Sequence, residues 1–116
     1  MNIRIVLVGA GSLSFGVSMF TDLYLSKVLR GSTIVLHDID EKKLEIIKDL
    51  LIAENEKLEN KFTLESTTDR KTAFKDADFI INSIEVGERF KLWRQDYEIP
   101  RKHGSTQVLG ECGGPG

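Results

Sequence analysis

Two glycines, a serine and an aspartate have the types and spacing that could do chemistry in this chain. Gly9, Gly11 and Ser12 follow directly on an apolar run at residues 3–8. Glycine has no Cβ, so a turn with two glycines can bring its backbone N–H groups close to a ligand. A helix that starts behind the turn presents its positive end to the same place, which favours a phosphate or pyrophosphate. These residues therefore predict a nucleotide-binding turn.

The turn departs from the usual dinucleotide fingerprint at one position. That fingerprint has glycine at three places, and the third place here holds Ser14, with Gly16 two residues further on. A glycine-rich turn can also be an ordinary connection between a strand and a helix. At this point both interpretations of the turn stay open.

Asp38 favours the dinucleotide interpretation. It comes at the end of a second apolar run, so it should lie at the same sheet edge as the glycine turn. A carboxylate at that place can accept hydrogen bonds from both ribose hydroxyls of an adenosine. It follows Gly11 by somewhat more than the ~20 residues expected, because the intervening helix is long. The charge of Asp38 would repel a 2′-phosphate, so we expect NAD rather than NADP.

The elements that must position these residues alternate regularly along the chain. We expect parallel strands near residues 2–8, 33–37, 62–67 and 78–84. The expected helices are residues 12–29, a helix capped by Asp40, a short helix opened by Asp69, and a helix from residue 88 to about Tyr97, followed by a turn of helix at Pro100 and a stop at Gly104. This order predicts an α/β fold, the first half of a Rossmann-like doubly wound parallel sheet, as one domain over residues 1–116.

The composition excludes several classes of partner. The net charge is -2 and no basic stripe is present, which argues against nucleic acid or an anionic membrane as the main partner. No apolar stretch approaches the ~20 residues of a membrane span. One cysteine, Cys112, has no partner for an internal disulfide. Together with Met1 leading almost directly into a strand, this predicts a cytoplasmic protein.

Two further polar residues are candidates for ligand contacts. Asn82 falls at the carboxyl end of the fourth expected strand, where it would reach cofactor or sugar hydroxyls, or else cap the backbone. Arg89, in the charged stretch that follows, is a candidate for holding an anionic substrate. His37 and His103 are expected to be structural and surface residues, because two scattered histidines make no metal site.

The motifs together resemble glycoside hydrolase family four, the NAD- and divalent-metal-dependent glycosidases such as alpha-glucosidase, alpha-galactosidase and alpha-galacturonidase. The resemblance covers the whole chain and is carried by Gly9-Ala10-Gly11-Ser12, His37-Asp38-Ile39-Asp40, Thr67-Thr68-Asp69-Arg70, residues 77–84, Val86-Gly87, Asp96 through Ile99-Pro100 to Gly104, and residues 110–116. The last segment is similar to the family's Glu-Thr-x-Gly-Pro-Gly-Gly, with Cys112 in place of the threonine.

The resemblance implies a hydrolase that works by transient oxidation. Family members use bound NAD to oxidise C3 of the sugar, and a divalent metal, usually manganese, supports loss of the C2 proton. Elimination of the glycosidic oxygen, addition of water and return of the hydride follow. The glycosidic bond is thus cleaved by a different mechanism from that of most glycosidases, which use a pair of carboxylates. The metal ligands and the base of the family would lie beyond residue 116, and Cys112 does not match them.

Carried over by position, the resemblance assigns Gly9, Gly11 and Ser12 to the pyrophosphate turn and Asp38 to the adenosine ribose. It places Asn82 and Glu111 near the nicotinamide and the sugar. The chain is therefore expected to be the amino-terminal cofactor part of a longer enzyme, with a carbohydrate substrate, inert alone, and exposing apolar surface that favours a homo-oligomer. Two alternatives stay open: an NAD-dependent 2-hydroxy-acid dehydrogenase of the lactate/malate type, and a non-catalytic NAD-sensing module.

Overall fold

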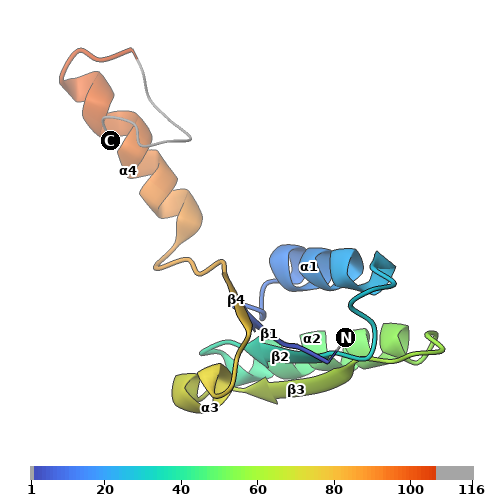
Figure 1. Cartoon of the computed structure of the whole chain (residues 1–116). Helices are drawn as coiled ribbons and strands as arrows, with labels where there is room; N and C mark the ends of the chain where they lie inside the picture. The colour runs from blue at the N-terminus through green and yellow to red at the C-terminus, as the bar shows by residue number, and fades with distance from the viewer. Residues whose placement is uncertain (1, 107–116) are drawn as a thin grey trace. The chain divides into compact units, whose positions relative to one another are not determined.

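The computed structural model describes residues 2–106, which alternate between strands and helices (Figure 1). The strands are β1 (Arg4–Val8), β2 (Thr33–His37), β3 (Thr63–Thr67) and β4 (Phe79–Asn82). The helices are α1 (Leu13–Leu25), α2 (Glu41–Asn55), α3 (Arg70–Phe74) and α4 (Arg89–Lys102). The chain divides into two compact units, Met1–Ile84 and Glu85–Gly116. Among residues 2–106, no helix is long and apolar enough to cross a membrane.

The four strands of the first unit form one parallel sheet in the order β3-β2-β1-β4. The register aligns the last residue of each strand: Val8 lies opposite His37 on one side and Asn82 on the other, and His37 lies opposite Thr67. From β1 the chain adds β2 and β3 on one side of the sheet and then crosses over to add β4 on the other side. Sheets of this kind bind ligands at the point where the strand order reverses, which here lies between β1 and β4. The predicted doubly wound half-sheet is confirmed.

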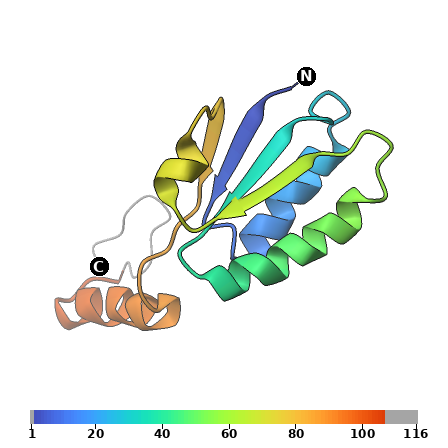
Figure 2. The same ribbon diagram turned by 90° about the horizontal axis from the view of Figure 1, so that it is seen from below.

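Helices cover both faces of this sheet (Figure 2). On one face, α1 and α2 pack on alternate residues of β1 and β2 in a core that contains Phe20, Leu44, Ile47 and Leu51. On the other face, the short α3 packs through Ala73. The residues of β1 and β2 that form these two cores are Ile5, Leu7, Ile34 and Leu36 on the first face and Val6, Val8 and Val35 on the second. Burial on both faces explains the unbroken apolar runs of these strands.

Helix α1 is shorter than the sequence predicts. Its pattern extends to residue 29, but the helix ends at Leu25, where the extended Ser26 (φ -77°, ψ 106°) caps it through an N–H bond to the Leu23 carbonyl. The apolar Val28 is 65% exposed, so no packing favours another turn of helix there. The predicted glycine at the end of this segment, Gly31, instead sits in the turn before β2 with φ +86°.

The second unit contains α4, which differs from the prediction at its proline. The expected break near Tyr97 is absent, and the helix runs through Pro100 to Lys102. Pro100 lies in the last turn, so its missing N–H removes only one bond of the helix. Its own carbonyl accepts from the Ser105 amide at 2.9 Å. The stop at Gly104 is confirmed, with φ +80°.

Candidate functional site

The glycine turn is tied to the end of β2 by backbone hydrogen bonds. The amides of Gly9 and Ala10 both donate to the His37 carbonyl, at 2.9 and 3.1 Å. The His37 ring is buried and its Nδ1 lies 2.9 Å from the Thr67 carbonyl. The predicted structural role of His37 is therefore confirmed, and its carbonyl has a second role that the sequence did not reveal. It fixes the turn against the strand that ends in Asp38.

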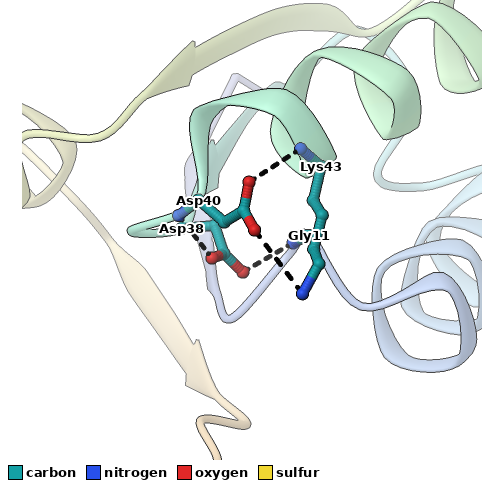
Figure 3. Close-up of polar contacts among 4 residues, drawn as sticks. All are labelled: Gly11, Asp38, Asp40 and Lys43. Atoms are coloured by element: carbon teal, nitrogen blue, oxygen red, sulfur yellow. Dashed lines mark hydrogen bonds and ion pairs between the residues drawn. The ribbon is translucent and has the colours of Figure 1, made fainter.

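Asp38 lies directly on the glycine turn (Figure 3). Its Oδ2 accepts from the Gly11 amide at 2.8 Å, and its Oδ1 accepts from the Asp40 amide at 3.0 Å. Each carboxylate oxygen keeps a lone pair for a further donor. The two predicted site residues thus meet across 27 positions of sequence. Both amides hold the carboxylate in one orientation before any ligand arrives.

Two of the backbone amides that the glycine spacing suggests for a phosphate have acceptors within the protein. The Gly11 amide is taken by Asp38, and the Ser12 amide donates to the Gly9 carbonyl at 3.2 Å. Ser12 caps α1, with its Oγ accepting from the Phe15 amide at 3.3 Å. The first amides of a helix have no acceptor within the helix. Among the described residues of the turn and the first turn of α1, the amides of Leu13 and Ser14 are therefore the ones without an acceptor in the helix.

The end of β4 approaches the turn from the other side. A Cβ on Gly9 would lie 2.2 Å from the Ser83 carbonyl oxygen, and Gly9 has φ +87°. Only glycine fits these two conditions. The predicted contact residue Asn82 is exposed at the end of β4, opposite Val8 in the register. Gly9 therefore lets the strand that carries Asn82 come against the turn.

Gly16 takes the packing role of the third fingerprint glycine. A Cβ there would lie 2.3 Å from the Ala10 carbonyl oxygen and 3.4 Å from Ile47 Cγ2. Close packing of the first helix on the strand end is the reason for the third glycine in a dinucleotide-binding turn. The position two residues earlier, Ser14, is exposed. The departure from the fingerprint is a shift of the close contact along α1, which the sequence spacing alone did not indicate.

A groove of about 400 Å³ runs between the starts of α1 and α2. Its lining residues are Gly11, Ser12, Leu13, Lys43, Ile46 and Ile47. Lys43 was not singled out in the sequence, although it is the fifth residue after Asp38. Its amide donates to Asp40 Oδ1 at 3.1 Å, and this bond holds the pKa of the Asp40 carboxyl below its ordinary value. The predicted N-cap role of Asp40 is thus confirmed.

The remaining predicted residues belong to the second unit or are not described. Arg89 belongs to the second unit, where its Nε pairs with Glu85 Oε1 at 2.6 Å. This pair lowers the pKa of Glu85 and raises that of Arg89. Glu111 lies outside the described residues, as does Cys112. Within residues 2–106, no three acidic, histidine or cysteine residues gather as a metal site.

Comparison with known proteins identifies relatives over almost the whole chain. The family model "Family 4 glycosyl hydrolase" matches residues 4–116. An alpha-glucosidase of Erwinia rhapontici is 48% identical over 120 residues, covering 100% of this chain and 26% of the relative. An alpha-galactosidase of Bacillus subtilis (strain 168) is 32% identical and covers 97% of this chain and 26% of the relative. The chain therefore spans about a quarter of the length of these relatives.

Solved structures agree with these relatives. The 6-phospho-beta glucosidase from Thermotoga maritima, solved with NAD and glucose-6-phosphate, has a TM-score of 0.77 and 26% identity, over 98% of this chain and 26% of that one. A 6-phospho-alpha-glucosidase from gut microorganisms, in complex with NAD and glucose-6-phosphate, has a TM-score of 0.73 and 29% identity, over 98% and 25%. Sequence and fold point the same way: this chain belongs to family 4 of the glycosyl hydrolases.

Proposed function

We propose that this chain is the NAD-binding part of a glycosidase, and that Asp38 and the start of α1 hold the adenosine half of the cofactor. The observation that carries the proposal is the Asp38 carboxylate, which is fixed by the amides of Gly11 and Asp40 at 2.8 and 3.0 Å. A carboxylate with free lone pairs beside a glycine turn suits a ribose diol. The NAD-bound state of two structural neighbours supports the same assignment.

The residues present fit an adenine dinucleotide laid across the strand ends. The ribose would bind Asp38, and the pyrophosphate would meet the Leu13 and Ser14 amides at the positive end of α1. Gly9, Gly11 and Ser12 then act by shaping the turn. Asn82, at the end of β4, would lie toward the nicotinamide and the sugar. Bound in this way, NAD supplies a hydride acceptor next to the substrate.

For the whole protein we propose cleavage of a glycosidic bond by transient oxidation at C3, elimination and addition of water. The family membership and the 48% identity to an alpha-glucosidase support this activity. A divalent metal, manganese by analogy with a neighbour solved with manganese, NAD+ and glucose-6-phosphate, belongs to the same proposal. Its ligands would lie beyond Gly116. The glucose-6-phosphate in that neighbour suggests that an anionic sugar is the substrate, for which Arg89 and Glu111 stay candidate contacts.

The activity is tested on the full-length protein with NAD, manganese and aryl glycosides, with and without a 6-phosphate. The proposal predicts release of the aglycone without net NADH, and incorporation of solvent deuterium at C2 of the released sugar. Accumulation of NADH with a 2-hydroxy acid would instead support a dehydrogenase, which the family match does not favour. Hydrolysis without exchange at C2 would contradict the oxidative route.

The cellular setting of the protein forms a separate part of the proposal. We expect a cytoplasmic enzyme that assembles as a homo-oligomer, with a carbohydrate as its small-molecule partner. The single cysteine in 116 residues supports the location, and the exposed Phe79 and Ile80 support the assembly. Size measurement of the purified full-length protein tests the assembly, and fractionation of cells tests the location.

A further inference from the structure

We propose that Lys43 determines how strongly the site discriminates between NAD and NADP. The inference rests on the proposed function and adds a residue to it. Lys43 lies in the first turn of α2, and Figure 3 shows its side chain running toward the turn that holds Gly11. A Cβ on Gly11 would lie only 3.1 Å from Lys43 Cβ. Lys43 also lines the groove together with Gly11 and Ser12. Its ammonium is thus carried to the place where Asp38 meets the turn.

The ammonium of Lys43 is only weakly committed to a partner within the protein. Its Nζ lies 3.5 Å from Asp40 Oδ2, and the two side chains are 68% and 41% exposed. Ion pairs this exposed contribute little to stability, because water screens them and two side chains must be ordered. Since a lysine side chain is also flexible, Nζ can turn from Asp40 to a phosphate at small cost.

The charges at the ribose end explain why this matters for the cofactor. Asp38 and Asp40 place two carboxylates within one turn of the chain, and both would repel a 2′-phosphate. The 2′-hydroxyl of NAD carries no charge, so the ammonium of Lys43 contributes little to the binding of NAD. With NADP, the ammonium offsets part of the repulsion. At an effective dielectric constant of about 40, between that of a protein surface and that of water, one charge pair about 6 Å apart contributes about 1.4 kcal/mol, which changes an affinity about tenfold.

Dissociation constants for NAD and NADP, measured by calorimetry on the purified protein, test this assignment. Lys43→Gln should weaken NADP binding about tenfold and change NAD binding less than about twofold. Lys43→Arg keeps the charge and should retain the NADP affinity. Lys42→Gln is the matched control: the same charge is lost from the same helical turn, but Lys42 does not line the groove. It should leave both affinities unchanged.

The same substitution is also tested in an Asp38→Ser variant, in which NADP binding is measurable even if the unchanged protein binds NADP weakly. Asp38→Ser removes the main repulsive charge and should raise NADP affinity at least about tenfold. Adding Lys43→Gln to Asp38→Ser should remove most of that gain. The assignment is overturned if the gain survives in the double variant, or if Lys43→Gln weakens NAD and NADP equally, which would place Lys43 on the pyrophosphate. Failure of the unchanged protein to bind NAD would instead refute the proposed function, and this inference with it.

Discussion

The carboxylate of Asp38 accepts a hydrogen bond of 2.8 Å from the backbone amide of Gly11. The bond joins the ends of β1 and β2, which are adjacent in the sheet but distant in sequence. It means that Asp38, the acid proposed to bind the ribose, and the glycine turn form one preorganised unit, because neither has to move to bring them together. Preorganisation of this kind improves binding by lowering the ordering cost.

Gly11→Ala is predicted to harm cofactor binding more than stability. The new Cβ would come 2.8 Å from Asp38 Oδ2, an atom at the end of a side chain that can rotate away. Rotation avoids the clash but breaks the bond that orients the carboxylate, so NAD affinity should fall about tenfold or more. The free energy of unfolding should change by only about 1 kcal/mol. Calorimetry and urea unfolding measure the two effects, and an unchanged NAD affinity would contradict the role of this contact.

Gly16→Ala is predicted to destabilise the fold. Its Cβ would lie 2.3 Å from the Ala10 carbonyl oxygen, a backbone atom that cannot turn aside. The overpacking should cost about 1–3 kcal/mol, partly offset by the better helix propensity of alanine. Ser18→Ala, on the exposed side of the same helix, serves as the control and should be neutral or slightly stabilising. Equal unfolding midpoints for both variants in urea would show that α1 does not pack on the turn as closely as described.

Glu65→Gln is predicted to remove a pH-dependent part of the stability. Arg4 donates to both carboxylate oxygens of Glu65, at 3.0 and 2.7 Å, and this pair lowers the pKa of Glu65. A group whose pKa is lowered on folding stabilises the protein above its unfolded pKa, which is near 4.5, and loses that contribution as the pH falls through the folded value.

The Glu65 side chain is 46% exposed, so the effect at pH 7 should be at most about 1 kcal/mol. Urea unfolding of both proteins at pH 7 and pH 3 gives the measurement. The difference between them should shrink toward zero at the lower pH, and a difference that grows there would contradict the pairing. The comparison of wild type with Glu65→Gln isolates this carboxyl from other acids such as Asp69, whose pKa is also lowered.

The 116-residue chain alone is predicted to be inactive and to self-associate. Strand β4 is at the edge of the sheet, and among the described residues nothing pairs with its outer side. Phe79 and Ile80 on it are 58% and 50% exposed. Such apolar surface and open strand edges favour association. Sedimentation and binding of an apolar dye measure this, and a dye-negative monomer at high concentration, or sugar hydrolysis with NAD and manganese, would refute it.

Much of the fold was predictable because its signals are local. Residue types within a few positions of each other determine several features. These are the apolar strands β1 and β2, the N-caps Asp40 and Asp69, and the end of α4 before Gly104. The bounds of α1 and α4 were less predictable. The apolar periodicity of α1 continues past Leu25, but the residues there have no surface to pack on. In α4, a proline in the last turn removes only one hydrogen bond, which is too little to end the helix.

The candidate site was predictable in its residues but not in its bonds. Glycine spacing and the acid after β2 indicate where Asp38 and the turn should meet. The engagement of the Gly9 and Gly11 amides by His37 and Asp38 depends on how strand ends lie in space, which no sequence pattern reports. The position of Lys43 depends likewise on the close approach of α2 to Gly11.

Titration of NAD, NADP and ATP by calorimetry against the unchanged protein and Asp38→Ala tests the central claim most directly. Asp49→Ala, an exposed carboxylate further along α2, is the control. We predict that NAD binds more tightly than NADP or ATP, and that Asp38→Ala weakens NAD by about 1.5–3 kcal/mol, one to two decades in affinity, while Asp49→Ala does not. Equal NAD affinity in Asp38→Ala and the unchanged protein, or ATP binding as tight as NAD binding, would contradict the account.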